Sequence, residues 1–343
     1  MKKILFATTA LVATAGFAAA EVAITGEAEM GIYNPNTETQ ETQFFTDLDV
    51  RFTMTGEADN GLTFGATIDL DEAADRSNPG RFESPNVPGG ENMFVAFGGA
   101  RLTMGDTDGA LDFAVPEMGL AGGSLNDDET NHAGFNDADG FFDGLLFGTA
   151  DDSGLAFDGA GDGQIARFDY SYDAFTFSVS AEQLANGDDV EVVVGTETLD
   201  LGSTVWGVGV SYSGDLSGVA LTAGLGYQTM EDVGDVTSVG VTGELTNGLS
   251  LGATYTQFSS DIDGLEDIDH VGVGVGYTMD AIAVGVNWGQ YESDGDNVEG
   301  WGLAGTYDLG GGLSARLGYG KNDFSDVGGD DYNTWSLGLR MNF

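Results

Sequence analysis

The sequence contains no cysteine, few basic residues and few prolines. The absence of cysteine excludes a disulfide scaffold, a thiolate metal site and a cysteine nucleophile. Only 10 of the 343 residues are Lys or Arg, against 57 Asp and Glu, so the formal net charge is −47. Because no basic patch can neutralise phosphates, we expect no nucleic-acid partner. The 56 glycines come with only 5 prolines, which excludes collagen.

The first 20 residues have the organisation of a secretory signal peptide. Two lysines follow the initial methionine, a mostly apolar stretch runs from Ile4 to Phe17, and three alanines end at Ala20. A membrane anchor would need about 20 apolar residues, and this stretch is shorter. We therefore expect residues 1–20 to be a signal peptide, cleaved before Glu21. Loss of two lysines leaves 8 basic and 57 acidic residues, a mature charge of 8 − 57 = −49.

Alternation of apolar and polar residues with period two organises residues 21–343. Near the start, Val22 and Ile24 share one face of a strand, whereas Thr25 and Glu27 share the other. Counting such runs predicts sixteen strands, joined alternately by short turns and long acidic loops. No later segment approaches about 18 consecutive apolar residues, so we expect no membrane-spanning helix. The alternation of short and long connections is typical of an antiparallel outer-membrane β-barrel.

A barrel of about sixteen strands is too wide to be filled by side chains and leaves an aqueous channel. The polar face is therefore expected to line a pore, and the apolar face to contact lipid. Residues 106–164 break the alternation and are expected to form one long loop. Interfacial aromatics support a membrane barrel over a soluble sandwich. One ring is expected near the short turns (Tyr172, Phe175, Tyr212, Tyr277, Tyr307, Phe343) and one near the long loops (Trp206, Tyr227, Tyr255, Trp288, Trp301, Tyr319, Trp335).

Two short enzyme motifs occur in contexts that do not suit them. Residues 248–252 read G-x-S-x-G, but a nucleophile elbow needs a strand, a sharp turn and a helix, and these residues follow a hairpin turn. Residues 300–305 read G-x-G-x-x-G, but no helix follows to bind a pyrophosphate. The two histidines, His132 and His270, are expected at the surface. The sequence therefore predicts no enzyme.

The charged residues of the polar face are the candidate pore lining. Four arginines lie there, together with several carboxylates: Arg51, Arg167, Arg316, Arg340, Glu27, Glu29, Asp47 and Asp49. Salt bridges to strand neighbours such as Asp49 and Asp169 are a structural alternative that is compatible with pore lining. A charge facing lipid would cost about 2 to 4 kcal/mol at the bilayer midplane, which favours the inward orientation.

Acidic residues also gather in the long loop. Asp127, Asp128 and Glu129 form one cluster, and Asp137 and Asp139 form another. Such carboxylates supply the oxygen ligands that Ca²⁺ prefers, although none completes an EF-hand loop. Solvated loop acids that bind no ion are the alternative.

The two ends of the chain carry a family resemblance. The final residues, WSLGLRMNF, set Trp335, Leu337, Leu339, Met341 and Phe343 on one face. This looks like the C-terminal strand that outer-membrane proteins present to the barrel assembly machinery. With the start EVAITGEAEMGIY, the hairpin FTMTGEADNGLTFGA and the segment YDLGGGLSARLGYGKND, the chain resembles the alphaproteobacterial general porins of the Rhodobacter type.

The resemblance implies a homotrimer of sixteen-stranded barrels in the outer-membrane lipids, with short periplasmic turns and long external loops. It also implies that the third external loop folds into the lumen, where its acids face wall arginines, and that calcium can bind among these acids. The function it implies is passive diffusion of small hydrophilic solutes and ions without a cofactor. From the charge we add a preference for cations. An acidic adhesin barrel and a soluble halophilic enzyme are the alternatives.

Overall fold

The computed structural model describes residues 21–34, 42–71, 89–127, 129–138, 154–158, 163–183, 191–194, 197–200 and 204–343. The first strand begins at Glu21, the residue that is expected to follow the cleavage site. Residues 1–20 lie outside the described residues, so the signal peptide stays a prediction.

Nearly all of the described chain is β-strand. The strands are β1 (Glu21–Asn34), β2 (Gln43–Glu57), β3 (Thr63–Asp71), β4 (Gly89–Phe97), β5 (Ala100–Gly105), β6 (Gln164–Tyr172), β7 (Phe175–Gln183), β8 (Glu191–Val194), β9 (Glu197–Asp200), β10 (Val205–Leu216), β11 (Val219–Met230), β12 (Gly234–Leu245), β13 (Leu249–Ser260), β14 (Ile268–Met279), β15 (Ile282–Ser293), β16 (Asp296–Gly310), β17 (Leu313–Asp323) and β18 (Tyr332–Asn342). One short helix, α1 (Ala110–Ala114), and two 3-10 turns, η1 (Leu125–Asp127) and η3 (Ser325–Val327), complete the described elements. None of these helices is long and apolar enough to cross a membrane.

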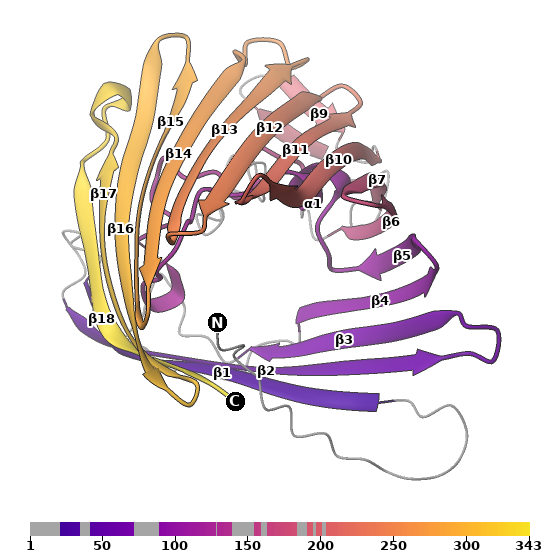
Figure 1. The fold of residues 1–343 in the computed structure, drawn as a ribbon. Coiled ribbons are helices and arrows are strands. Elements are labelled where there is room, and N and C mark those ends of the chain that lie inside the picture. Colours follow the sequence, from indigo (N-terminus) through magenta and orange to yellow (C-terminus); the bar gives the residue numbers. More distant parts are fainter. Residues whose placement is uncertain are drawn as a thin grey trace.

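Sixteen of the described strands form one closed antiparallel barrel, which confirms the predicted fold class. Each strand pairs with its neighbours in the chain, except that β7 pairs with β10, because β8 and β9 form a separate two-stranded sheet. The barrel closes where β18 pairs with β1, with Met341 opposite Ala28 and Trp335 opposite Asn34. Figure 1 shows β18 beside β1 at this closure, next to the C-terminus.

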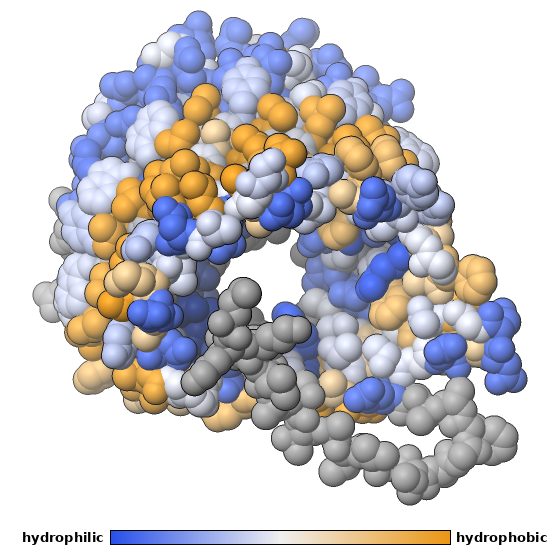
Figure 2. Space-filling view, in the orientation of Figure 1, coloured by the Kyte–Doolittle hydropathy of each residue, from blue (hydrophilic) through white to orange (hydrophobic). Residues whose placement is uncertain are grey.

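The two faces of each strand differ as the alternation predicts. Outward residues such as Phe44, Met93 and Leu337 are exposed to the surroundings of the barrel. In Figure 2, hydrophobic residues form a band around the outer wall, and hydrophilic residues lie above it and inside the opening. An apolar outer band can contact lipid, because every strand of a closed barrel satisfies its backbone hydrogen bonds with its neighbours.

The two ends of the barrel have different connections. At one end, which we call the turn end, tight hairpins place single residues such as Asp173 and Asp280 in the left-handed conformation, at φ of 57° and 52°. At the opposite loop end the connections are uneven. The links from β11 to β12 and from β15 to β16 are only three and two residues long. Long connections, such as the one from β5 to β6, therefore share this end of the barrel with tight turns.

Candidate functional site

The long segment between β5 and β6 lies inside the barrel. We call its described residues, 106–127, 129–138, 154–158 and 163, the inner loop. Helix α1 contacts β7, β10 and β11, and the turn η1 contacts β1, β17 and β18. Figure 1 shows α1 on the inner side of β10 and β11. On its return, the backbone N–H of Phe157 donates to Gln228 Oε1 of β11 at 3.0 Å. The inner loop therefore lines the wall from β10 to β18 and narrows the lumen.

Inward-facing glycines make room for the inner loop. A Cβ atom at Gly226 of β11 would lie 2.7 Å from Cα of Leu111, closer than side chains can approach. A Cβ at Gly276 of β14 would lie 2.6 Å from the carbonyl oxygen of Leu120, and one at Gly302 of β16 would overlap that of Glu129. Gly302 belongs to the apparent G-x-G-x-x-G motif. In this strand no helix follows the motif. Its glycines instead allow the inner loop to pack closely against the wall.

Hydrogen bonds hold the start of the inner loop. The backbone N–H of Gly109 donates to Asp158 Oδ2 at 2.8 Å, which ties the beginning of the loop to its end. The N–H of Ala110 donates to Ser180 Oγ of β7 at 2.9 Å. Both hydrogen bonds are buried, so breaking either one would leave a buried polar group with no hydrogen-bond partner, not even water.

At η1, the inner loop contacts a largely buried network of ion pairs on the wall. Asn126 and Asp127 both adopt left-handed φ values, 50° and 51°, which Asn and Asp tolerate better than most residues. This bend directs the N–H of Asn126 at Glu29 Oε2 of β1, at 2.5 Å. Arg316 of β17 lies 3.4 Å from Glu29 Oε1 and 3.3 Å from Asp127 Oδ1, and it donates to the carbonyl oxygen of Ser124. One arginine thus links wall and loop.

The returning part of the loop is anchored to β15, β17 and β18. Ser336 Oγ donates to Glu129 Oε2 at 2.9 Å, Asn287 Nδ2 donates to the carbonyl oxygen of Thr130 at 2.8 Å, and the N–H of Ala133 donates to Asn322 Oδ1 at 2.6 Å. Glu129 is fully buried, and this burial raises the pKa of its carboxyl group.

Both histidines lie in this contact, so the expectation that they are surface residues is wrong. His132 and His270 are each only 2% exposed. His270 Nε2 donates to the carbonyl oxygen of Gly134 at 3.0 Å, and the Tyr291 hydroxyl donates to that of Phe135 at 2.5 Å. Burial lowers the pKa of His132 to about 4. Because the loop folds inward, it covers both its own histidine and the one on the wall.

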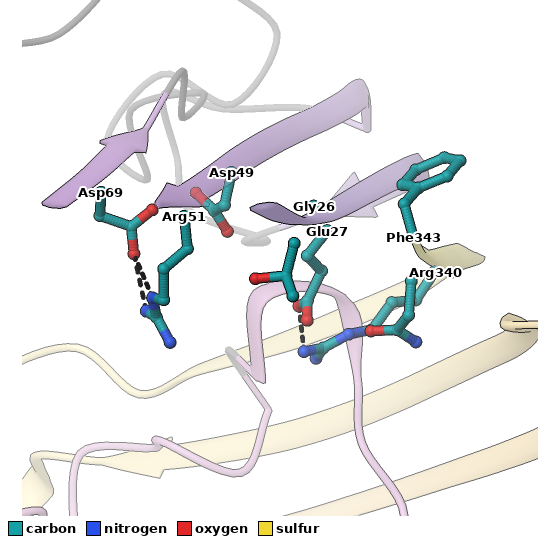
Figure 3. A pocket seen from close by; sticks show the side chains of 9 residues that line it. Gly26, Glu27, Asp49, Arg51, Asp69, Arg340 and Phe343 are labelled. Atoms are coloured by element: carbon teal, nitrogen blue, oxygen red, sulfur yellow. Dashed lines mark hydrogen bonds and ion pairs between the residues drawn. The ribbon is translucent and has the colours of Figure 1, made fainter. Parts of the chain in front are cut away.

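The opposite side of the lumen, on β1 to β6, and the end of β18 near the C-terminus carry paired charges. Arg51 Nη2 lies 2.6 Å from Asp69 Oδ2, and Arg340 is bonded to Glu27. Figure 3 shows both pairs, with Asp49 beside Arg51.

Two further arginines on this side lie against aromatic rings. Arg167 is buried, with Nε 3.2 Å from Asp169 and its guanidinium 3.7 Å from the ring centre of Phe113 in the inner loop. Arg101 lies 3.8 Å from the ring centre of Phe94 and forms no ion pair in the described part of the chain.

A closed sixteen-stranded barrel with a polar lumen and a loop folded into it is the architecture of a pore-forming protein. The Gram-negative porin family model matches residues 7–327 of the chain. The chain belongs to this family. It is an outer-membrane channel protein rather than a member of an enzyme family.

Individual relatives agree with the family. The chain is 27% identical to a porin of Rhodobacter capsulatus over 342 residues, which cover 94% of this chain and all of that one. Its fold is similar to that of a porin refined at 1.8 Å resolution, with a TM-score of 0.63 and 21% identity. A triple mutant of the Rhodopseudomonas blastica porin has a TM-score of 0.60 and 17% identity. Both structural similarities cover 94% of this chain and 100% of the other.

The structure places all eight predicted wall residues of this porin on inward faces, but not all of them reach the open lumen. Glu29 and Arg167 are only 3% and 5% exposed, because η1 covers the first and Phe113 the second. Arg51 bonds to Asp69 rather than to Asp49. The wall arginines are therefore members of ion pairs as well as pore-lining groups.

The predicted loop acids separate from one another. Asp127 lies at η1 with half of its side chain exposed, whereas Glu129 faces the wall. Asp137 is partly buried further along, and Asp128 and Asp139 lie outside the described residues. Within the described ranges, no group of three or more His, Asp or Glu is arranged to hold a metal ion. Calcium binding in the acidic loop therefore stays a prediction.

Sequence reasoning missed several residues of the lumen. Arg101 was not among the candidates, although it alternates with outward apolar residues and the same rule would have placed it inward. Phe113 and the glycines opposite the inner loop were also missed. No local signal marks their role, because it depends on which wall the loop covers.

Proposed function

We propose that this porin forms a water-filled channel for passive diffusion of small hydrophilic solutes and ions, and that it needs no cofactor and catalyses no reaction. The observation that carries this proposal is the unequal filling of the lumen. The inner loop occupies the side bounded by β10 to β18, and an opening persists at the centre of the barrel (Figure 2). Polar and charged groups line the opposite side, as a hydrated passage requires.

We further propose that the channel prefers cations. The wall arginines add little net positive charge, because Arg51, Arg167 and Arg340 are each paired with at least one carboxylate. The excess of 57 acidic over 10 − 2 = 8 basic residues in the mature chain therefore decides the potential that an entering ion meets. Carboxylates around a low-dielectric passage raise the local concentration of cations.

The reversal potential of the purified protein in a planar bilayer under a salt gradient tests both proposals. A stable conductance supports the channel, and the sign of the potential at 0.1 M salt reports ion preference. Salt screens charges over about 8 Å at physiological strength and about 3 Å at 1 M, so the preference should weaken as salt rises. Absence of any conductance would refute the channel, whereas an anion-selective conductance would refute only the cation preference.

The route to the membrane is part of the same proposal. Residues 1–20 act as an export signal, the outer apolar band contacts outer-membrane lipids, and the barrels assemble as homotrimers. The outward residues of β18, such as Leu337, and the following Phe343 are the surface presented to the barrel assembly machinery. These residues are exposed on the outer face beside the closing seam with β1, which supports that role. Calcium binding by the acidic loop residues stays a proposal from the sequence.

A further inference from the structure

A pocket of about 370 Å³ opens on the wall next to η1, towards the turn end. Glu29 of β1 accepts a hydrogen bond from the backbone N–H of Asn126 in the inner loop. Glu27, two residues closer to the turn end, lines the pocket. Pockets for small ligands have volumes of about 300 to 1,000 Å³, so this one is large enough only for a small solute.

The pocket brings together charges of both signs. Arg51 and Arg340 line it with Glu27, Asp49 and Asp69, giving two cations and three carboxylates. Strand register places Glu27 opposite Asp49, and Arg51 opposite Asp69. Figure 3 shows the two guanidinium groups bonded to Asp69 and Glu27. The carboxylates of Glu27 and Asp49 therefore lie between the two guanidinium groups.

One guanidinium keeps free donor capacity. Arg51 bonds to Asp69 through Nε and Nη2, and its Nη1 has no hydrogen-bond partner among the described residues. The Arg51 side chain is 61% exposed, so a solute can reach it. A carboxylate is the group that guanidinium nitrogens bind best. The carboxylates of Asp49, on the same strand as Arg51, and of Glu27, on β1, also line the pocket and can accept hydrogen bonds from an ammonium group.

We propose that this pocket binds small zwitterionic solutes that carry an ammonium and a carboxylate group a few bonds apart, as α-amino acids do. The solute carboxylate contacts Arg51, and its ammonium group contacts Asp49 and Glu27. The excess of carboxylates disfavours dianions, and a simple cation has no carboxylate to bind Arg51. The proposal rests on the proposed function, because the pocket would bind solutes as they diffuse through the channel.

Four solutes of nearly one shape test the charge requirement. L-alanine is zwitterionic, L-alaninamide is a cation, lactate is an anion and lactamide is neutral. At about pH 6 an α-amino group with a pKa near 8 is protonated. Binding of each to the detergent-solubilised full-length barrel is measured by saturation-transfer NMR, and single-channel conductance is recorded in parallel. We expect L-alanine to bind at least several-fold more tightly than the other three.

Variants assign the binding to the pocket. Arg51→Gln should weaken L-alanine binding by about tenfold, which is the effect of losing one charge-assisted hydrogen bond. Asp49→Asn should weaken binding of both L-alanine and L-alaninamide. Lys321→Gln makes the same charge change at the loop end of β17, outside the pocket, and should leave binding unaltered. Migration before and after boiling checks that each variant forms a barrel.

The outcomes separate the two proposals. Equal binding of L-alanine and lactamide, or of L-alanine and either singly charged solute, would overturn the zwitterion site, as would unaltered binding to Arg51→Gln. The channel proposal would still stand if the conductance were normal. Selective L-alanine binding without conductance would instead support the site and refute the channel.

Discussion

Replacing Gly302 with alanine tests whether close packing of the inner loop against the wall shapes the channel. Gly302 lies on the inward face of β16, and a Cβ there would overlap the carbonyl oxygen of Glu129 and lie 2.8 Å from its carbonyl carbon. Ordinary contact begins at 3.4 Å, so the loop backbone must move away from the wall. Gly305 is the matched control. It lies on the outward face of the same strand, where a Cβ would be 3.5 Å from the Leu317 side chain.

The free-energy cost of the displaced loop follows from comparing Gly302→Ala with Gly305→Ala. Both replace a strand glycine with alanine, so the gain from a less flexible unfolded chain is common to both and cancels. What differs is the overpacking at Gly302, which costs about 1 to 3 kcal/mol. Since about 1.4 kcal/mol corresponds to a factor of ten, the fraction of molecules with the loop detached should rise roughly 5- to 160-fold. The barrel itself should persist, because its strand pairing is untouched.

Amide hydrogen exchange is the direct assay, because exchange of a protected N–H follows the population of the open state. The N–H of Ala133, which donates to Asn322, should exchange faster in Gly302→Ala than in Gly305→Ala by the factor above. The displaced loop also moves towards the lumen, so single-channel conductance should fall in Gly302→Ala only. Equal exchange and equal conductance in the two variants would refute the claim that wall glycines position the loop.

Four further predictions concern the barrel, its assembly, the loop and the ion pairs. The native protein should migrate differently on a gel before and after boiling, with the trimer above the monomer mass, because a closed barrel resists detergent; identical migration would contradict the fold. Deleting Phe343 should lower the amount of assembled barrel in the outer membrane, and unaltered levels would contradict its role as an assembly signal. Burial lowers the pKa of His132 from 6.5 to about 4, so the packed loop favours the neutral ring. Loop protection should therefore fall between pH 6.5 and 4, with His132 contributing up to about 3 kcal/mol, and should fall less in His132→Gln, where the buried His270 still contacts the loop; equal pH profiles would show that His132 does not contribute. Arg316→Gln leaves buried Glu29 without its link to Asp127, so exchange around Asn126 should rise, whereas Lys321→Gln should not alter it.

Much of the fold could be predicted because a strand has only two faces. Once Val22 and Ile24 are assigned to lipid, Glu27 and Glu29 must point inward, and the same parity places Arg51 and Arg340. However, the alternation of faces does not predict which inward side chains the inner loop buries. Glu29 and Arg167 share a face with Arg51, yet the inner loop buries the first two and leaves the third exposed.

The sequence by itself determined the number of barrel strands, their antiparallel order and the orientation of each side chain, because alternation is a local property that one strand displays alone. Only the tertiary structure decided which wall the inner loop covers, and therefore which residues line the open lumen. The contacts of His132 with the wall, of Asn126 with Glu29 and of Glu129 with Ser336 join residues far apart in the chain. Such contacts depend on the closed shape of the barrel, which brings β1, β17 and β18 together around the loop.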